Sequence, residues 1–358
     1  MLVVHIGPRK TATTYLQQNF YLNRAELLAR GWLYPVLSVN AQNAHHEVVS
    51  SLALLRAGRG RLVASMARAA KLAAGKSANI LISSEGFRKW KPADFSVLGE
   101  RLGQKDILIV YTLRDPIDML VSVWGEAVKN GKAPSLKAYA RRQLADPLKS
   151  PVLNCLFELD PIKAEPGLKL KVLDYEAIMR SGSDIYQQFG KHILGLEGLE
   201  PAKLRRSNES FSFEVEDYLR LVAREIDYDP AKAERLFSRQ FLQCHTRDEI
   251  AHIDAVIRRA DLAEDVPISR DEPWYAALQS EILQSTGPLI VPPPIEGEKL
   301  FTGRVEMARS CDMDALAKAP EIGDLLAESC KRMRAVGLPF KRGRIARAWR
   351  YLKRLVSV

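Results

Sequence analysis

The sequence predicts an α/β protein in which a parallel β-sheet carries helices on both faces and a helical C-terminal portion follows. Three observations lead to this fold class. Short apolar runs alternate with segments of helical periodicity through the first half of the chain. The runs at 2–6 and 107–113 are almost continuously apolar, as in strands that a parallel sheet buries on both faces. From about residue 211 to 283 the apolar spacing is helical only.

Taken in order, the strands are expected at 2–6, 32–34, 79–83, 107–113 and 168–173. A helix-like run from 15 to 28 follows the first strand, and later helices are expected at 213–224, 230–243, 249–260 and 272–283. The proline-rich segment 290–295 is expected to be an extended linker. The chain is therefore divided into an α/β core at 1–210, a mainly helical portion of the same domain at 211–330, and a tail at 331–358.

The loop after the first strand has the composition of an anion site. It reads Gly7-Pro8-Arg9-Lys10-Thr11-Ala12-Thr13-Thr14 and leads directly into a helix-like run. A strand that ends in a glycine-containing turn and feeds a helix presents free backbone N–H groups, which bind anions. Lys10 adds a charge and the threonines add hydroxyl donors. The usual nucleotide loop has a second glycine immediately before the lysine, where this chain has Arg9.

A second candidate segment follows the apolar run at 107–113. It begins with Arg114-Asp115-Pro116, and Ser122 follows eight residues after the arginine in a helix-like run. Proline is favoured in the first turn of a helix, so Arg114 is expected at the carboxyl end of a strand, where open α/β sheets bind ligands.

These two segments, in this order, resemble the 5′-phosphosulfate loop and the 3′-phosphate motif of sulfotransferases that use 3′-phosphoadenosine 5′-phosphosulfate (PAPS). The resemblance implies a P-loop NTPase-like sulfotransferase fold that binds PAPS and releases 3′,5′-adenosine bisphosphate. It implies that the 3′-phosphate is held by Arg114 and Ser122. It also implies a 5′-phosphate site formed by Gly7, Arg9, Lys10, Thr11, Ala12, Thr13 and Thr14.

The chain departs from the family pattern at several places. Arg9 stands for a proline and Ala12 for a glycine, the latter being the smallest change and a good helix former. Segments 170–176 and 207–212 resemble further stretches of the family. The family's G-x-x-G-x-x-K loop is not found, so the third wall of the adenine and 3′-phosphate pocket is unassigned, with Arg205 and Arg206 as substitutes by charge alone.

The expected reaction is in-line sulfuryl transfer to a hydroxyl or amine of an acceptor, with Lys10 stabilising the leaving phosphate and no metal required. A hydroxyl acceptor needs a base. Glu85 follows the strand at 79–83 and is the first candidate, and His46 is the second because imidazole titrates near neutral pH. The acceptor is left open among a glycan, a lipid-linked sugar and a small metabolite.

Two other classes compete with this interpretation. A P-loop kinase would use the same lysine and threonines with Mg²⁺ held by Asp115 or Glu85. The missing glycine before the lysine and the spacing from Arg114 to Ser122 argue against it. A non-catalytic scaffold that keeps the fold is the other alternative, and the altered loop at Arg9 and Ala12 and the missing third motif keep it open.

Composition indicates a cytoplasmic enzyme. The 358 residues are 47% hydrophobic, with no apolar stretch long enough for a membrane span. The first strand begins almost at once, so no signal peptide is expected. The four cysteines are widely spaced and predict neither a disulfide framework nor a zinc site.

Positive charge is concentrated in the tail. Residues 331–358 contain ten of the 53 Lys and Arg residues and none of the 43 Asp and Glu residues, so residues 1–330 are formally neutral. Ile345, Trp349, Leu352 and Val356 recur at helical spacing, which predicts a basic amphipathic helix. Such a helix can lie on the inner face of the membrane or pack against the enzyme. Nucleic acid is not expected as a partner, because no aromatic stacking platform accompanies the charge.

If the tail binds membranes, the full-length protein will sediment with anionic liposomes at low salt, and a variant lacking residues 341–358 will not. The deleted segment holds seven of the tail's ten basic residues, each of which contributes about 1 kcal/mol near an anionic surface. Neutral liposomes are the control. A full-length protein that stays in the supernatant at low salt would place the tail on the enzyme instead.

Overall fold

The computed structural model describes residues 1–8, 10–37, 43–131, 133–203, 211–229, 237–303, 305 and 307–336. The chain divides into two compact units. Unit 1 comprises Met1–Met119, Asp146–Arg206 and Arg270–Arg304, and unit 2 comprises Leu120–Ala145, Ser207–Ser269 and Val305–Val358. These boundaries differ from those expected at 210 and 330, because 120–145 group with the later helices and 270–304 with the sheet.

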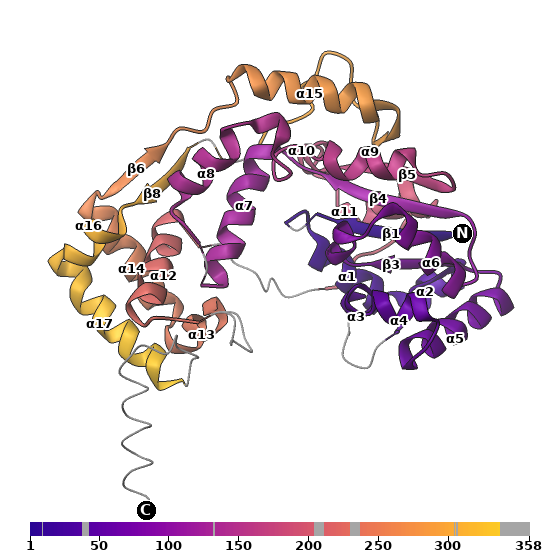
Figure 1. The fold of residues 1–358 in the computed structure, drawn as a ribbon, viewed down its shortest axis with the longest axis horizontal. Coiled ribbons are helices and arrows are strands. Elements are labelled where there is room, and N and C mark those ends of the chain that lie inside the picture. Colours follow the sequence, from indigo (N-terminus) through magenta and orange to yellow (C-terminus); the bar gives the residue numbers. More distant parts are fainter. Residues whose placement is uncertain are drawn as a thin grey trace, which may run out of the picture. The chain divides into compact units, whose positions relative to one another are not determined.

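The described part of unit 1 is built on a six-stranded parallel sheet flanked by helices (Figure 1). Its strands are β1 (Leu2–Gly7), β2 (Trp32–Leu33), β3 (Asn79–Ser83), β4 (Ile107–Leu113), β5 (Leu168–Asp174) and β7 (Ile290–Val291). They lie in the order β2-β3-β1-β4-β5-β7. The five strands expected from the sequence are all present, and the long apolar β4 is buried along its whole length.

Helices of unit 1 connect these strands. They are α1 (Thr13–Leu22), α2 (Arg24–Ala29), α3 (His46–Ser50), α4 (Leu52–Ala57), α5 (Arg61–Gly75), α6 (Pro92–Arg101), α9 (Leu156–Ala164), α10 (Tyr175–Arg180), α11 (Ile185–Phe189) and α15 (Pro273–Thr286). Shorter turns are η1 (Glu85–Lys89), η2 (Pro147–Lys149), the π-helical η3 (Gly190–Leu194) and η5 (Gly287–Leu289). Helix α7 (Pro116–Lys129) begins in unit 1 and continues into unit 2.

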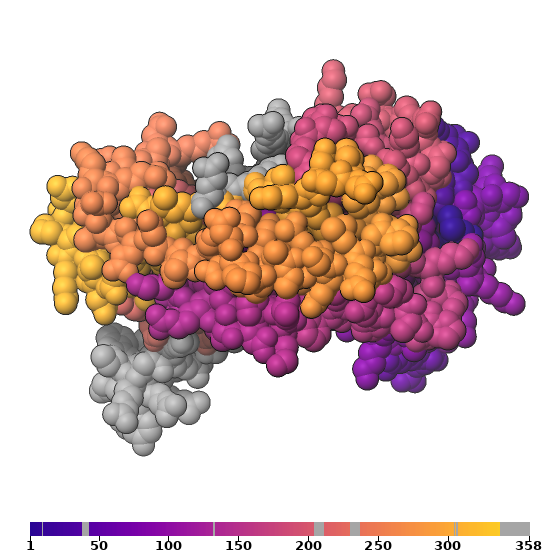
Figure 2. Space-filling view, turned by 90° about the horizontal axis from the view of Figure 1, so that it is seen from above, coloured from indigo at the N-terminus to yellow at the C-terminus, as the bar shows by residue number. Residues whose placement is uncertain are grey.

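Alternate residues of β4 point to opposite faces of the sheet, and each face carries helices. Leu108 and Val110 belong to a buried apolar cluster with residues of α1, α2, α10 and α11. On the other face, Ile107 packs against α6 at Gly99, where a Cβ would lie 2.7 Å from the Ile107 side chain. The sequence-predicted arrangement of a parallel sheet between helices is therefore present. Helix α15 forms part of the outer surface (orange in Figure 2).

Unit 2 is mainly helical. Its helices are residues 120–129 of α7, α8 (Leu136–Leu144), α12 (Phe213–Glu225), α13 (Phe237–Cys244), α14 (Arg247–Ala260), α16 (Met313–Lys318) and α17 (Pro320–Ala335). Two strands, β6 (Ala263–Val266) and β8 (Ala308–Cys311), pair antiparallel. Asp217, buried within α12, accepts a hydrogen bond from the Cys311 backbone N–H at 2.6 Å and so ties β8 to this helix.

Three segments differ from the sequence-based expectation. The helix expected at 15–28 is two helices that meet at Asn23, whose amide donates to the Glu200 carbonyl at 2.9 Å. The linker expected at 290–295 begins with β7, which pairs with β5. The stretch expected to be helical from 211 to 283 contains β6. Strands β6 and β7 form by pairing with segments that are distant in the sequence, and local periodicity does not reveal such pairing.

Two predicted segments lie partly outside the described residues. These are residues 230–236 of the helix expected at 230–243, and residues 337–358 of the tail.

Among the described residues, every helix is too short or too polar to cross a lipid bilayer.

Two histidines are buried at the carboxyl ends of β1 and β3. His5 has no exposed surface, and its ring nitrogens lie 2.8 Å from Ser83 Oγ and 3.2 Å from Thr112 Oγ1. His45 Nδ1 accepts from the Ser83 backbone N–H at 3.0 Å, and its Nε2 lies 2.8 Å from the Pro35 carbonyl. Burial lowers the pKa of His5 to about 3 and that of His45 to about 4. Both rings are therefore neutral parts of the core at pH 7.

We expect these histidines to make the protein acid-sensitive. Their pKa values are lower in the folded than in the unfolded state, so below pH 6.5 the unfolded chain binds more protons and stability falls with pH. Each histidine should cost about 2 kcal/mol between pH 6.5 and pH 5. Urea unfolding at pH 7 and pH 5 measures the loss, which His45→Asn or His5→Asn should reduce. The exposed His252 is the control, and an equal loss in His252→Asn and both buried-site variants would contradict the assignment.

Candidate functional site

The reversal in strand order lies between β1 and β4. The connection after β1 leads to β2 on one side of the sheet, whereas the connection after β4 leads to β5 on the other side. Open α/β sheets bind ligands outside the carboxyl ends of their strands at such a point. Here, that position carries the loop after β1 and Arg114 after β4.

Two of the described non-glycine residues in the loop adopt left-handed backbone conformations. Gly7 ends β1 with φ +91°, Lys10 has φ +68°, and Ala12 has φ +56° as the N-cap of α1. A left-handed conformation costs an L-residue roughly 1–2 kcal/mol. Ala12 therefore occupies a position that suits glycine, and the expectation that alanine is favourable there as a helix former is wrong. The loop is held by the Thr11 hydroxyl, which is buried and donates to the Pro8 carbonyl at 2.7 Å.

The first turn of α1 is suited to an anion. Its N-cap residue is alanine, which provides no side-chain hydrogen bond, and the first turn contains no acidic residue. The N-terminal N–H groups of a helix carry partial positive charge and satisfy their hydrogen bonds with anions. Thr13 is buried and Thr14 exposed within that turn. Together with the Lys10 ammonium, these donors fit a phosphate group.

Arg114 lies at the same edge and contacts the loop. Its Nη1 donates to the Lys10 carbonyl at 2.6 Å, and its Nη2 lies 3.4 Å from Asp118 Oδ2. The guanidinium carbon is 5.8 Å from the centre of the Tyr175 ring, and 13% of the side chain is exposed. The structure therefore brings Arg114 and the loop together, as the sequence predicts. Ser122 lies on the part of α7 that belongs to unit 2, and Arg9 lies outside the described residues.

An arginine that the sequence analysis missed completes this charge cluster. Arg270 forms a two-pronged contact with Asp115, at 2.9 and 3.1 Å, and donates to Asp118 at 2.8 Å. Both carboxylates have no exposed surface. Tyr275 donates to Asp115 at 2.5 Å, and Asp115 accepts the Asp118 N–H at 2.9 Å at the start of α7. Burial opposes the charge of Arg270, but its hydrogen bond to Asp115 and the electrostatic attraction of Asp115, Tyr275 and Asp118 together outweigh that cost and raise the pKa of the guanidinium.

Gly303 lies against Arg270. A Cβ at this glycine would lie 1.8 Å from Arg270 Nη2, and its φ of +59° is left-handed. The local sequence gives no sign of this contact, since a single arginine beside an acidic residue is ordinary on a surface.

The two candidates for the base are neighbours. Glu85 begins η1 directly after β3, and His46 begins α3. His46 Nε2 lies 4.0 Å from Glu85 Oε1, and its Nδ1 lies 2.8 Å from Ser84 Oγ. The Gln17 amide of α1 donates to Glu85 Oε2 at 3.3 Å. Glu85 is 17% exposed and His46 is 58% exposed, so the imidazole is the more accessible group.

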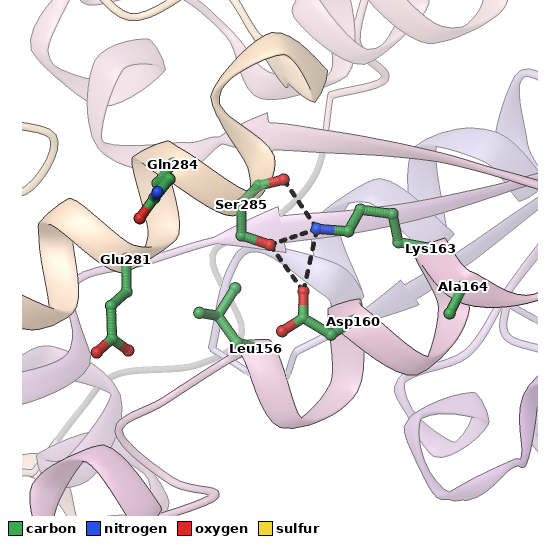
Figure 3. A pocket seen from close by; sticks show the side chains of 7 residues that line it. All are labelled: Leu156, Asp160, Lys163, Ala164, Glu281, Gln284 and Ser285. Carbon is green, nitrogen blue, oxygen red and sulfur yellow. Dashed lines mark hydrogen bonds and ion pairs between the residues drawn. The ribbon is translucent and has the colours of Figure 1, made fainter.

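Two cavities lie elsewhere. A surface groove of about 500 Å³ runs between α9 and α15, where Lys163 contacts Asp160 and Ser285 (Figure 3). A pocket of about 320 Å³ in unit 2 is lined by α14 and α17, and Arg332 is paired there with Glu249 and Glu328. Neither contains a residue of the predicted site. Among the described residues, no group of three or more His, Cys, Asp or Glu side chains is placed to hold a metal ion.

Comparison with protein-family models, curated proteins and solved structures gave no match for this chain. Its function is therefore inferred from its residues and their geometry.

Replacing Arg270 with methionine should destabilise the protein by about 3–5 kcal/mol, because it leaves the buried carboxylates of Asp115 and Asp118 without their main cation. Urea unfolding measures the change. The control is Lys149→Met, which removes an exposed pair with Asp146 and should cost less than about 1 kcal/mol. Similar stability of the two variants would contradict the importance of the buried cluster.

Proposed function

We propose that the protein is a PAPS-dependent sulfotransferase that transfers a sulfuryl group to an acceptor hydroxyl or amine. The observation that carries the proposal is the contact between Arg114 and the Lys10 carbonyl. It joins the two segments that resemble the family's phosphate-binding motifs at one edge of the sheet. A ligand with two separate phosphates fits two such neighbouring groups.

The donor, when bound, supplies a sulfuryl group on an activated phosphate. The N–H groups at the start of α1 and the ammonium of Lys10 would hold the 5′-phosphate. Lys10 would also neutralise the charge that develops on the phosphate oxygen as the sulfuryl group departs. Arg114 would hold the 3′-phosphate, with Ser122 as its expected partner. Glu85, with His46 beside it, would take the acceptor's proton.

The charge cluster also bears on the kinase alternative. A kinase would need a carboxylate such as Asp115 for Mg²⁺. The carboxylate oxygens of Asp115 are engaged by Arg270, Tyr275 and the Asp118 N–H. These contacts disfavour Asp115 as a magnesium ligand, so a kinase would have to use the other candidate carboxylate, Glu85.

We expect 3′,5′-adenosine bisphosphate to raise the melting temperature without magnesium. At about 100 times its Kd the ligand stabilises the fold by about 2.7 kcal/mol, which corresponds to several degrees. Arg114→Ala, compared with its own ligand-free melting temperature, should lose most of this shift. Lys10→Ala should abolish sulfuryl transfer whatever its effect on binding, because its interaction is strongest in the transition state.

Mg·ATP and the surface variant Arg30→Ala serve as controls. Mg·ATP should stabilise the protein less than the bisphosphate does, and Arg30→Ala should keep the full shift. A larger shift with Mg·ATP would favour a kinase. No shift with either nucleotide would favour a scaffold and reject the sulfotransferase.

A further inference from the structure

The His46 ring is held so that the position of its proton can be inferred. Ser84 has no exposed surface, and its Oγ accepts the Gly86 N–H at 3.2 Å. A buried hydroxyl also donates its own proton. Among the described residues, the acceptor that the structure gives this hydroxyl is His46 Nδ1, at 2.8 Å. Nδ1 therefore accepts, and the neutral ring carries its proton on Nε2, the nitrogen that faces Glu85.

A chain of polar groups orients Glu85 toward that nitrogen. The Gln17 amide, which is buried, donates to Glu85 Oε2 and to Ser83 Oγ, each at 3.3 Å. Ser83 Oγ is in turn 2.8 Å from Nδ1 of the buried His5. These contacts fix one carboxylate oxygen inside the protein, and the other oxygen, Oε1, lies 4.0 Å from His46 Nε2.

A separation of 4.0 Å is too long for a direct hydrogen bond, but one oxygen atom about 2.8 Å from both groups fits this geometry. Such an oxygen would accept the N–H of His46 and donate its O–H to Glu85. A hydroxyl oxygen has two lone pairs, so it can accept from His46 with one and attack sulfur with the other. A neutral amine nitrogen has one lone pair. An amine that accepted from His46 would have no lone pair left for the attack.

We propose that this site sulfates hydroxyl groups rather than amines, with Glu85 as the base and His46 as a donor that positions the acceptor oxygen. This inference rests on the proposed sulfotransferase function. The acceptor oxygen forms a bond to sulfur while the bond from sulfur to the 5′-phosphate oxygen breaks. The electron pair of that bond stays on the phosphate, and the acceptor's proton passes to Glu85.

The first test does not depend on activity. Nitrogen-15 NMR of the full chain labelled in histidine reports which ring nitrogen carries the proton, and the signal that disappears in His46→Gln assigns His46. We expect the Nε2–H form at pH 8, and Ser84→Ala should weaken this preference. A ring protonated at Nδ1 in the wild-type protein would overturn the inference even if the bisphosphate binds.

The second test uses water as the simplest hydroxyl acceptor and follows PAPS hydrolysis. Glu85→Gln should lower the rate about 10²- to 10⁴-fold, as loss of a base does. His46→Ala should lower it at least about tenfold, and His46→Gln, whose amide can donate an N–H, should restore most of the rate. Glu26→Gln and His192→Ala, which replace residues outside the site, should keep the wild-type rate.

If His46→Gln is as slow as His46→Ala, the imidazole is the base and the proposed roles are wrong. Transfer to the nitrogen of glucosamine in preference to any of its hydroxyls would overturn the choice of hydroxyl. A different result would reject the sulfotransferase function itself. In that case the bisphosphate would give no thermal shift, although the His46 proton could still be found on Nε2.

Discussion

Two carboxylates without exposed surface, Asp115 and Asp118, are neutralised by a guanidinium that the chain supplies 152 to 155 residues later. The first turn of α7 depends on this arrangement, because two buried negative charges at one helix start are tolerated only when they are paired. Asp118 also contacts Arg114, and Arg114 contacts the Lys10 carbonyl. The shape of the loop after β1 is thus linked through three side chains to the segment that contains Arg270.

The loop is flanked by two networks of different character. The one that follows β4 is ionic, made of arginines and aspartates, and suits the binding of charged phosphates. The one that follows β1 and β3 is built from neutral groups, His5, Ser83 and Gln17, and ends at Glu85. In the proposed reaction, the ionic network would serve the phosphates and the network that ends at Glu85 would serve proton transfer.

Sequence periodicity was sufficient for strands β1 to β5, because strands buried in a parallel sheet are mostly apolar, as β4 is along its whole length. The approach of Arg114 to the loop was also predictable, since neighbouring parallel strands place their carboxyl ends together. The contacts of Arg270 could not be predicted, because no local pattern distinguishes this residue and its partners lie far away in the chain. Glu85 and His46 were predicted as alternative candidates for the base, whereas in the structure they lie next to each other. That relation depends on how α3 packs beside η1, which spacing alone does not encode. The roles of all the site residues, Arg9 and Ser122 included, stay predictions.

The left-handed residues Lys10 and Ala12 have a consequence for the thermodynamics of binding. Glycine at these positions would adopt the same shape with less strain, but it would leave the loop with many more accessible backbone states. A loop of lysine, threonine and alanine that is held by Thr11 and Arg114 has few alternatives to the conformation that it adopts. A ligand of this loop would therefore lose little affinity to ordering entropy. Backbone strain at Lys10 and Ala12 would take the place of conformational freedom that such a ligand would otherwise have to remove.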